Sequence, residues 1–285
     1  MKRYVIIGGG PAGISAAEAI RQNDAEGEIV VLSQDTAPFY YRTDLDLFIG
    51  GRMALEKLTV HPPEFYRDQR IDVRLGQTVQ RIVVERNAVG LASGDELAYD
   101  RLLIATGARP VVVSWPGVDL DGVLTVRTLQ DAQALVARLA TARQAVVVGG
   151  GLLGLIAAEA LRRRGLSVTL LVREPRLWWP VLDLPASDIL RRKLEAEGNI
   201  VRTEEEVAQF GGDKALKEVR TTKGNVLQAD LSVVAIGVRP NVDLLQGTPI
   251  ETDRGVVVNE YLQSSVPNVY AAGDVAQAFD VVQRA

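Results

Sequence analysis

A glycine-rich stretch occurs twice in this chain of 285 residues, and both copies have the same surroundings. The stretch "YVIIGGGPAG" begins at residue 4 and "AVVVGGGLLG" at residue 145, so Gly8 corresponds to Gly149. A β-branched run precedes each copy, and an alanine-rich run, "AAEAI" or "AAEAL", follows it. A second β-branched run comes next, at 28–33 and at 166–172. The pattern predicts two βαβ units of the nucleotide-binding kind.

The stretches that follow the two βαβ units also resemble each other. Residues 71–110 alternate short strands with Gly and Asp turns and contain the buried strand "RLLIATG", and residues 216–240 repeat this up to "VVAIG". We predict an α/β fold with two Rossmann-like βαβ domains, each with a small antiparallel three-stranded insert. The turns "SWPG" and "LLQGTP" mark the boundaries. The first domain would be discontinuous, 1–112 plus 246–285, and the second, 113–245, would be inserted in it.

The spacing of the glycines has a physical reason. In the first copy Gly8 permits a tight turn, Gly10 lets the backbone approach a pyrophosphate, and Gly13 lets the helix pack closely on the strand. The helix N-terminus then presents N–H groups and the positive end of its dipole to the phosphates. The residues predicted to bind a dinucleotide are Gly8, Gly10, Pro11, Ala12 and Gly13 in the first loop and Gly149, Gly151, Leu152, Leu153 and Gly154 in the second.

A residue that reads the ribose is expected at the end of the second strand of each unit. The first unit offers Gln34 and Asp35, and the second offers Arg173 and Glu174. A carboxylate there prefers a free 2′-hydroxyl, whereas an arginine accommodates a 2′-phosphate. In the second unit Arg173 and Arg176 favour NADPH, whereas Glu174 leaves NADH open, and a solvated charged turn is a third interpretation.

Composition excludes several classes of protein. The chain has no cysteine, which excludes disulfides, thiolate metal ligands and a redox dithiol and fits a cytoplasmic protein. The net charge is −4 and the Lys and Arg residues are scattered, so no nucleic-acid partner is expected. No run is long and apolar enough for a membrane span. No metal-ligand cluster exists, and His61, the only histidine, is expected in a loop.

Five motifs occur in a diagnostic order: "GGGPAG", "LLIATGARP", "GGGLLG", "VVAIGVRPN" and "PNVYAAGDVA". Together they span nearly the whole chain, which resembles the two-dinucleotide-binding-domain flavoproteins, the pyridine nucleotide-disulfide oxidoreductase superfamily. The stretch "PFYYRTDL" is similar to the ferredoxin/rubredoxin-reductase-like and nitrite-reductase-large-subunit-like branch. That branch has a Tyr-x-Arg segment where the disulfide reductases have a cysteine pair.

The resemblance implies FAD in the first domain and NADH or NADPH as co-substrate in the second. Hydride would pass from NAD(P)H to FAD, and electrons would go on to an external acceptor: an iron–sulfur or rubredoxin-type protein, a quinone or oxygen. A complementary chain or an oligomer is compatible with this interpretation. The alternative is a non-catalytic flavoprotein that serves as a redox sensor, a scaffold or one part of a larger electron-transfer assembly.

The resemblance also assigns residues by position. Gln34 and Asp35 would meet the adenosine ribose of FAD, Arg42 and Arg127 its phosphates, and Asp274 its ribityl chain. The remaining residues implied to contact a cofactor are Val79, Ala105, Thr106, Gly107, Gly237 and Gly273. The flavin carries the chemistry, so no catalytic side chain is predicted.

Two departures from the family pattern stand out. Many members carry a lysine after the Tyr-x-Arg segment and a glutamate after the second loop, where this chain has Leu47 and Ile156. Replacing both partners of a buried ion pair with apolar groups can be nearly neutral, so we predict that Leu47 and Ile156 are neighbours beside the flavin ring. The second departure is the end of the sequence at Ala285, soon after Asp274. A truncated FAD domain, a completing partner chain and an open FAD end are the alternatives.

Overall fold

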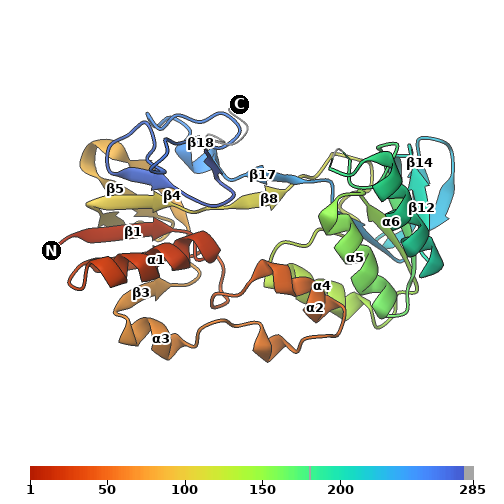
Figure 1. Cartoon of the computed structure of the whole chain (residues 1–285), viewed down its shortest axis with the longest axis horizontal. Helices are drawn as coiled ribbons and strands as arrows, with labels where there is room; N and C mark the ends of the chain where they lie inside the picture. Colours follow the sequence, from red (N-terminus) through yellow and green to blue (C-terminus); the bar gives the residue numbers. More distant parts are fainter. Residues whose placement is uncertain (180, 279–285) are drawn as a thin grey trace. The chain divides into compact units, whose positions relative to one another are not determined.

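The computed structural model describes residues 1–179 and 181–278, which fall into two compact units. The first unit contains Met1–Tyr41, Thr59–Arg109 and residues 239–278. The second contains Arg42–Leu58 and Pro110–Val238. The chain therefore passes between the units four times (Figure 1).

The division of the chain differs from the sequence-based boundaries in one segment. The crossings near 110 and 239 lie close to the expected 112 and 246, but Arg42–Leu58, expected in the first domain, packs with the second unit. The short helix α2 (Leu45–Ile49) in this segment contacts α4 (Leu129–Arg138) and α5 (Leu152–Arg163). Its apolar side chains are buried there, with Leu45 3% and Ile49 5% exposed. Burial of this apolar face accounts for the difference.

The first unit is built on a parallel five-stranded sheet in the order β19-β7-β1-β2-β3. Its strands are β1 (Arg3–Ile7), β2 (Glu28–Leu32), β3 (Ile71–Arg74), β7 (Arg101–Ile104) and β19 (Val269–Ala271). An antiparallel three-stranded sheet is made of β4 (Val79–Val83), β5 (Ala88–Leu91) and β6 (Glu96–Ala98). The helices are α1 (Pro11–Asn23) and α3 (Pro63–Asp68), and β18 (Val256–Val257) pairs with β20 (Ala276–Gln277).

Side chains alternate across the first sheet, so its strands bury both faces. Ile6 points to one face and packs with Ile14 and Ala17 of α1. Val5 points to the other face and packs with a core that includes Val89 of β5. The sheet is thus covered by α1 on one side and by the small antiparallel sheet on the other (Figure 1). This layering explains the nearly continuous apolar sequence of β1.

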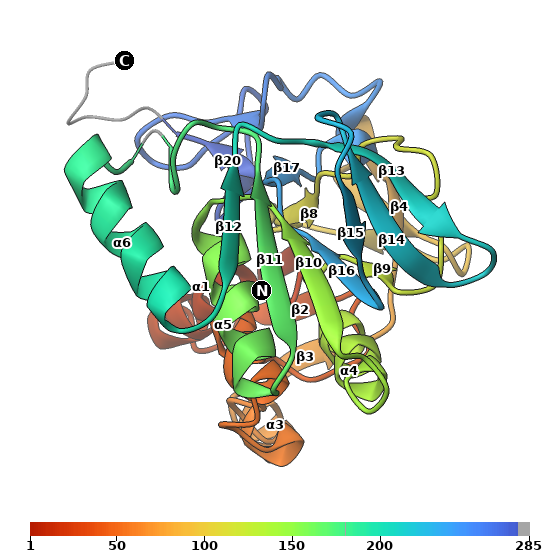
Figure 2. The same cartoon turned by 90° about the vertical axis from the view of Figure 1, so that its right-hand side faces the viewer.

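The second unit repeats this architecture with strands in the order β12-β11-β10-β16-β9, all parallel (Figure 2). The strands are β9 (Val123–Leu124), β10 (Gln144–Val148), β11 (Ser167–Val172), β12 (Ile200–Thr203) and β16 (Leu231–Val234). The antiparallel sheet is β13 (Val207–Gly212), β14 (Leu216–Thr221) and β15 (Val226–Gln228), and α6 (Leu184–Ala196) precedes β12. The fold predicted from the repeat is confirmed, because each unit has a parallel sheet and a three-stranded antiparallel sheet.

Short elements complete the chain. Strands β8 (Ala108–Pro110) and β17 (Val238–Pro240) pair with each other where the chain passes from one unit to the other. Four 3-10 turns are described: η1 (Arg42–Asp44), η2 (Leu55–Lys57), η3 (Val84–Arg86) and η4 (Asp243–Leu245).

Candidate functional site: two equivalent glycine loops

The two glycine loops have nearly the same backbone. Gly8 N–H donates to the carbonyl of Leu32 at 2.8 Å, and Gly149 N–H donates to that of Leu171 at 2.9 Å. Gly10 caps α1 with φ −84° and ψ −172°, and Gly151 caps α5 with φ −84° and ψ −178°. The sequence repeat is therefore also a repeat of geometry.

Two glycines of each loop are required by packing inside the protein. Gly8 has φ +120° and Gly149 has φ +119°, a region that favours glycine. A Cβ on Gly8 would overlap the carbonyl of Ala105, and one on Gly13 would overlap the carbonyl of Gly8. The second loop repeats both overlaps, Gly149 with Ala235 and Gly154 with Gly149.

The second glycine of the Gly149-x-Gly151-x-x-Gly154 pattern, Gly151, is not required by packing inside the protein. A Cβ on Gly151 would meet nothing within 4 Å, and its φ is open to any residue. Open space in front of a backbone at a helix start is what a pyrophosphate needs. Among the described residues no side chain caps α1 or α5, and neither first turn has an acidic residue. Both helix N-termini thus offer N–H groups, and the residues present fit a dinucleotide.

The "AAGDVA" motif lies against the first loop. A Cβ on Gly273 would come within 2.9 Å of the Cβ of Ala12, so this turn contacts the start of α1. Asp274 follows and is exposed. The chain thus brings an acidic residue to the first loop, and the contact of Asp274 with the ribityl chain of FAD stays a prediction.

The two predicted ribose readers of the first unit differ in their surroundings. Gln34 is exposed just beyond β2. Asp35 is partly buried, and its carboxylate accepts hydrogen bonds from Ala37 N–H at 3.1 Å and from Tyr40 Oη at 2.8 Å. Asp35 therefore holds its own turn together, and Gln34 is the more available of the two.

The strand end at Ala105 is fixed by Asn241, a residue outside the set predicted from the sequence. Thr106 Oγ1 donates to the carbonyl of Asn241 at 2.9 Å, and Asn241 Nδ2 donates to the carbonyl of Thr106 at 2.9 Å. Asn241 N–H also donates to the carbonyl of Gly107, which has φ +66°. The sequence signal that could have identified Asn241 is the similarity of the "ATGARP" motif to the "AIGVRPN" motif, which ends in this residue.

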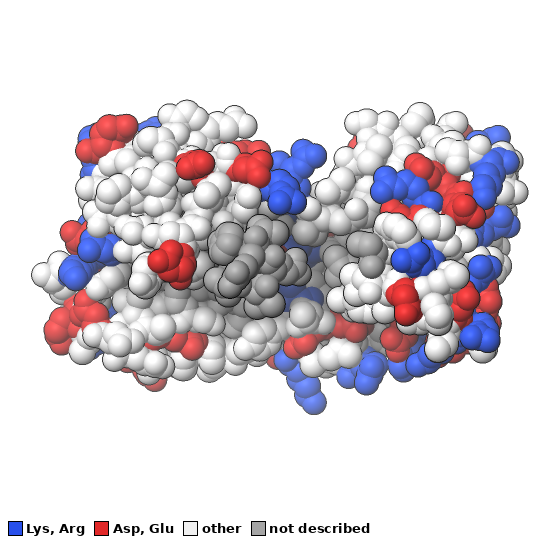
Figure 3. Space-filling model, turned by 45° about the horizontal axis from the view of Figure 1, so that its top comes forward, with Lys and Arg blue, Asp and Glu red and all other residues white. Residues whose placement is uncertain are grey.

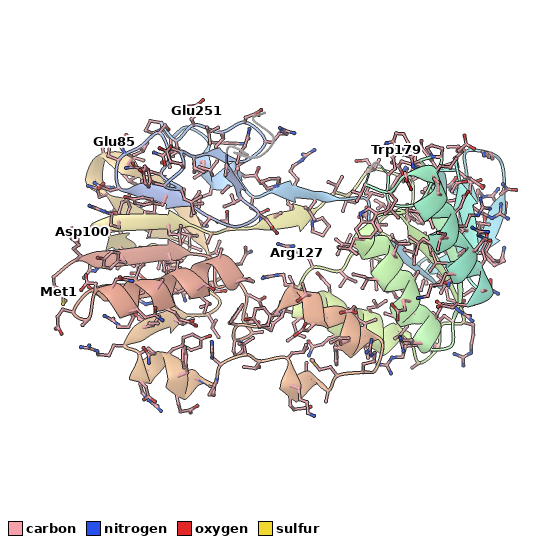
Figure 4. The ribbon with its side chains drawn as sticks, viewed as in Figure 1. Met1, Glu85, Asp100, Arg127, Trp179 and Glu251 are labelled. Atoms are coloured by element: carbon pink, nitrogen blue, oxygen red, sulfur yellow. The ribbon has the colours of Figure 1, made fainter. Side chains whose placement is uncertain are left out.

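Four other residues that we predict to contact a cofactor lie outside the two glycine loops. Val79 opens β4 and is partly buried against the core of the first unit. Arg42 and Arg127 both belong to the second unit, where Arg127 precedes α4 and its N–H donates to Asp131 (Figure 4). Gly237 has φ +116°, and its carbonyl accepts from Val111 N–H. The roles of these residues toward a cofactor stay predictions.

The segment after β11 borders the second loop. The side chain of Val172 lies directly under Gly150, where a Cβ would approach Val172 Cγ1 to 2.6 Å, and Trp178 N–H donates to the carbonyl of Gly150 at 2.7 Å. Arg173 forms an ion pair with Glu174 at 2.9 Å. The exposed Trp179 lies on this segment (Figure 4), and Arg176 Cζ is 4.0 Å from its ring centroid.

Leu47 and Ile156 lie on two helices that pack together in the second unit. A Cβ on Gly50 would lie 3.5 Å from Ala160 Cα, and Arg164 Nε donates to the carbonyl of Ile49 at 2.6 Å. One helical turn earlier on each helix come Leu47 and Ile156. Burial raises the pKa of the nearby Asp46 carboxyl above its ordinary value, and the Asp44 and Glu159 carboxylates add to the shift. The surroundings of Leu47 thus disfavour additional negative charge.

Other kinds of site find no support in residues 1–179 and 181–278. No three His, Cys, Asp or Glu side chains gather there where they could hold a metal ion. No helix of this part has the length and apolarity to cross a membrane. His61 Nε2 lies 3.1 Å from a Glu18 carboxylate oxygen, and its ring stacks on Phe65 at 4.0 Å. Acidic and basic side chains are interspersed on the face drawn in Figure 3.

Comparison with known proteins finds one family across the chain. The sequence model of the family described as pyridine nucleotide-disulphide oxidoreductase matches residues 2–285. The NADH-dependent phenylglyoxylate dehydrogenase subunit epsilon of Aromatoleum evansii is 34% identical over 276 residues, which cover 97% of this chain and 65% of that protein. The rubredoxin-NAD(+) reductase of Pseudomonas putida is 33% identical over 276 residues, 96% of this chain and 72% of that protein.

A solved structure agrees with these sequence matches. The reductase in the covalent putidaredoxin reductase–putidaredoxin complex superposes with a TM-score of 0.94 at 30% identity, covering 99% of this chain and 69% of that one. The chain spans 65% of the length of the Aromatoleum relative and about a third of the length of two further curated relatives.

Proposed function

Because the chain belongs to the pyridine nucleotide-disulphide oxidoreductase family, we propose that it is an NAD(P)H oxidoreductase that works through bound FAD. Family membership confirms the resemblance predicted from the five motifs. The observation that carries the proposal is the duplicated loop, with the same backbone geometry at Gly10 and Gly151 and a helix N-terminus behind each. One loop would hold FAD and the other the nicotinamide dinucleotide.

The chemistry that bound FAD would supply is acceptance of a hydride from NAD(P)H and transfer of the electrons to an acceptor. The residues of the chain bind and orient. Gly8 and Gly13 shape the first cradle, Gly10 caps α1 there, and Gly273 brings Asp274 to it. The reciprocal hydrogen bonds of Thr106 and Asn241 fix the strand end beside Gly8.

The acceptor lies outside this stretch of chain in our proposal, because the sequence contains no cysteine and hence no dithiol. Two of the similar proteins are a rubredoxin-NAD(+) reductase and a reductase solved in complex with putidaredoxin. A small electron-carrier protein of that kind is the partner that we propose, and a quinone or oxygen is an alternative acceptor. A cytoplasmic location fits the lack of cysteine and stays a prediction.

A non-catalytic flavoprotein is the second candidate. The observation that favours it is the apolar pair Leu47 and Ile156, where the resemblance implies two charges. Such a protein would serve as a sensor, as a scaffold or as one part of a larger assembly.

One experiment separates these functions. The purified protein is loaded with FAD, its visible spectrum is recorded, and NADH or NADPH is added without oxygen. Rapid bleaching of the flavin bands supports the oxidoreductase, whereas a yellow protein that does not respond supports the second candidate. A colourless protein contradicts both. The variant Gly151→Val is the matched control: we expect it to keep the flavin spectrum and to lose the bleaching, because its side chain fills the second cradle.

A further inference from the structure

The loop of residues 173–177, between β11 and α6, is flanked by two residues that both contact Gly150. On its N-terminal side, the side chain of Val172 packs under Gly150. On its C-terminal side, Trp178 N–H donates to the carbonyl of Gly150 at 2.7 Å, and Trp178 has φ +51°. Gly150 is the middle residue of the second "GGG". The 173–177 loop is therefore attached directly to the dinucleotide cradle.

The strand end in front of this loop offers no acceptor for a ribose hydroxyl. Val148 pairs with Leu171 in the second sheet as Ile7 pairs with Leu32 in the first, so Val172 corresponds to Ser33. Val172 is aliphatic and 0% exposed. A dinucleotide fold that selects a free 2′-hydroxyl places a carboxylate in this region, about 20 residues past the glycines. Here the strand end at Val172 is apolar and closed to water, and the carboxylate that follows, Glu174, already accepts a hydrogen bond from Arg173.

Two arginines stand on the 173–177 loop instead. The side chain of Arg173 is 69% exposed. Arg176 is held from two sides, because its Nε donates to the carbonyl of Leu182 at 2.9 Å and its guanidinium lies over Trp179. Glu174 is the only acid of the loop, and its carboxylate already accepts from Arg173 Nη2 at 2.9 Å. The loop thus carries a net charge of +1.

The first unit provides a contrast at the same place. Gln34 and Asp35 stand where the second unit has Arg173 and Glu174. Asp35 is engaged with Ala37 and Tyr40, and the residues that follow it up to Tyr41 include no basic side chain. The positive charge is therefore a property of the second cradle and not of the repeat.

We propose that the 173–177 loop binds a 2′-phosphate, so that the second cradle selects NADPH over NADH; this rests on the proposed function of that cradle. A phosphate monoester carries a charge of about −1.5 to −2 at neutral pH and three strong acceptor oxygens. A guanidinium binds such a group through two parallel hydrogen bonds. Arg173 exchanges Glu174 for the phosphate, and Arg176 is already oriented by Trp179 and Leu182.

The test uses fragments that carry the 2′-phosphate without any redox chemistry. Binding of 2′,5′-ADP and of 5′-AMP to the FAD-loaded protein is measured by titration calorimetry. We expect 2′,5′-ADP to bind at least about tenfold more tightly, and the difference to shrink as salt is raised. Arg173→Gln should remove about tenfold of this preference and leave 5′-AMP binding unchanged. Arg173 is exposed, so this variant should fold.

A matched control comes from the same unit. Arg191 lies on α6 in an exposed ion pair with Glu195 at 2.9 Å, and Arg191→Gln should change neither affinity. Equal or tighter binding of 5′-AMP, no binding of either fragment, or an unchanged preference in Arg173→Gln would overturn the inference. The proposed function fails separately: a flavin that no dinucleotide reduces contradicts it even where 2′,5′-ADP binds. Conversely, reduction by NADH together with a preference for 5′-AMP overturns only the inference.

Discussion

Thr106 and Asn241 exchange two hydrogen bonds across 135 positions of sequence. Each residue donates from its side chain to the backbone carbonyl of the other, at 2.9 Å in both cases. Asn241 Oδ1 also accepts from Arg109 Nη1 at 3.0 Å. The contact joins the two segments on which the chain leaves and re-enters the first unit. It therefore sets the geometry of Thr106 and Gly107, which we predict to lie against the cofactor.

Replacing Asn241 should loosen this contact. In Asn241→Ala the carbonyl of Thr106 loses its donor and Arg109 loses an acceptor, so we expect a loss of about 1–3 kcal/mol in the free energy of unfolding. Asn241→Asp keeps the acceptor for Arg109 and loses only the donor, so it should cost less. Urea denaturation of both variants measures the two losses. An Asn241→Ala protein as stable as the wild type would show that the contact contributes nothing.

The glycines of the second loop should separate into two kinds. Gly154→Ala forces a Cβ into the carbonyl of Gly149, so the variant should be destabilised by several kcal/mol, as expected for overpacking at a fixed backbone. Gly151→Ala meets open space and should unfold at nearly the wild-type temperature. The same variant should bind NADH and NADPH more weakly, because its methyl group occupies the space for the pyrophosphate.

Thermal unfolding and fluorescence titration of these two variants provide the measurement. Gly165 is a suitable control for a glycine with no internal contact: it has φ +85°, so Gly165→Ala should cost stability without changing nucleotide affinity. Undiminished binding by Gly151→Ala would contradict the assignment of the cradle.

Leu47 and Ile156 should be coupled in a double-mutant cycle. Ile156→Glu alone adds a carboxylate beside α2, where Asp46 and Glu159 already lie, and should lower the free energy of unfolding by about 1–3 kcal/mol. Adding Leu47→Lys should restore part of that loss, because the new charges pair. Urea denaturation of the wild type, both single variants and the double variant yields the coupling energy. A coupling near zero would place the two side chains apart.

Stability should depend on pH through Glu205, a buried acid in the second unit. It is 4% exposed and accepts from Thr221 Oγ1 at 2.6 Å and from Asn225 Nδ2 at 2.7 Å. Burial raises the pKa of this carboxyl, but the hydrogen bonds and the charge of Arg202 outweigh burial, so the pKa is lowered overall. The stabilisation is therefore complete above the unfolded-state pKa of about 4.3 and is lost as pH falls through the folded-state pKa.

The variant Glu205→Gln tests this dependence. It should be less stable than the wild type by about 1–3 kcal/mol near neutral pH, and the difference should shrink below about pH 4. Glu206→Gln, at the exposed neighbouring position, is the control and should show neither effect. If the difference in stability between the wild type and Glu205→Gln did not change with pH, Glu205 would act through packing and not through its charge.

The sequence predicted the parts of the fold that local chemistry determines. Gly8 and Gly149 need positive φ, and the apolar strands before them must be buried, so both loops and both sheets could be read from the repeat. The role of Asn241 could not, because a hydrogen bond to Thr106 depends on a crossing strand 135 positions away. The engagement of Asp35 by Tyr40 depends likewise on how one turn folds back.

The placement of Arg42–Leu58 was missed for a different reason. Its apolar residues, such as Leu45 and Ile49, have the pattern of any buried short helix, and the pattern does not say which core buries them. Sequence order suggested the first unit. Because the apolar face of this segment is buried against α4 and α5, the segment belongs to the second unit.

The same segment bears on any attempt to dissect the protein. A gene fragment encoding only 110–238 would leave out α2 and uncover the apolar surface of α4 and α5 that α2 shields. We expect such a fragment to aggregate unless a peptide corresponding to 42–58 is supplied or fused to it. Each of the two units is made of more than one segment, so neither can be isolated by cutting the chain at only two positions.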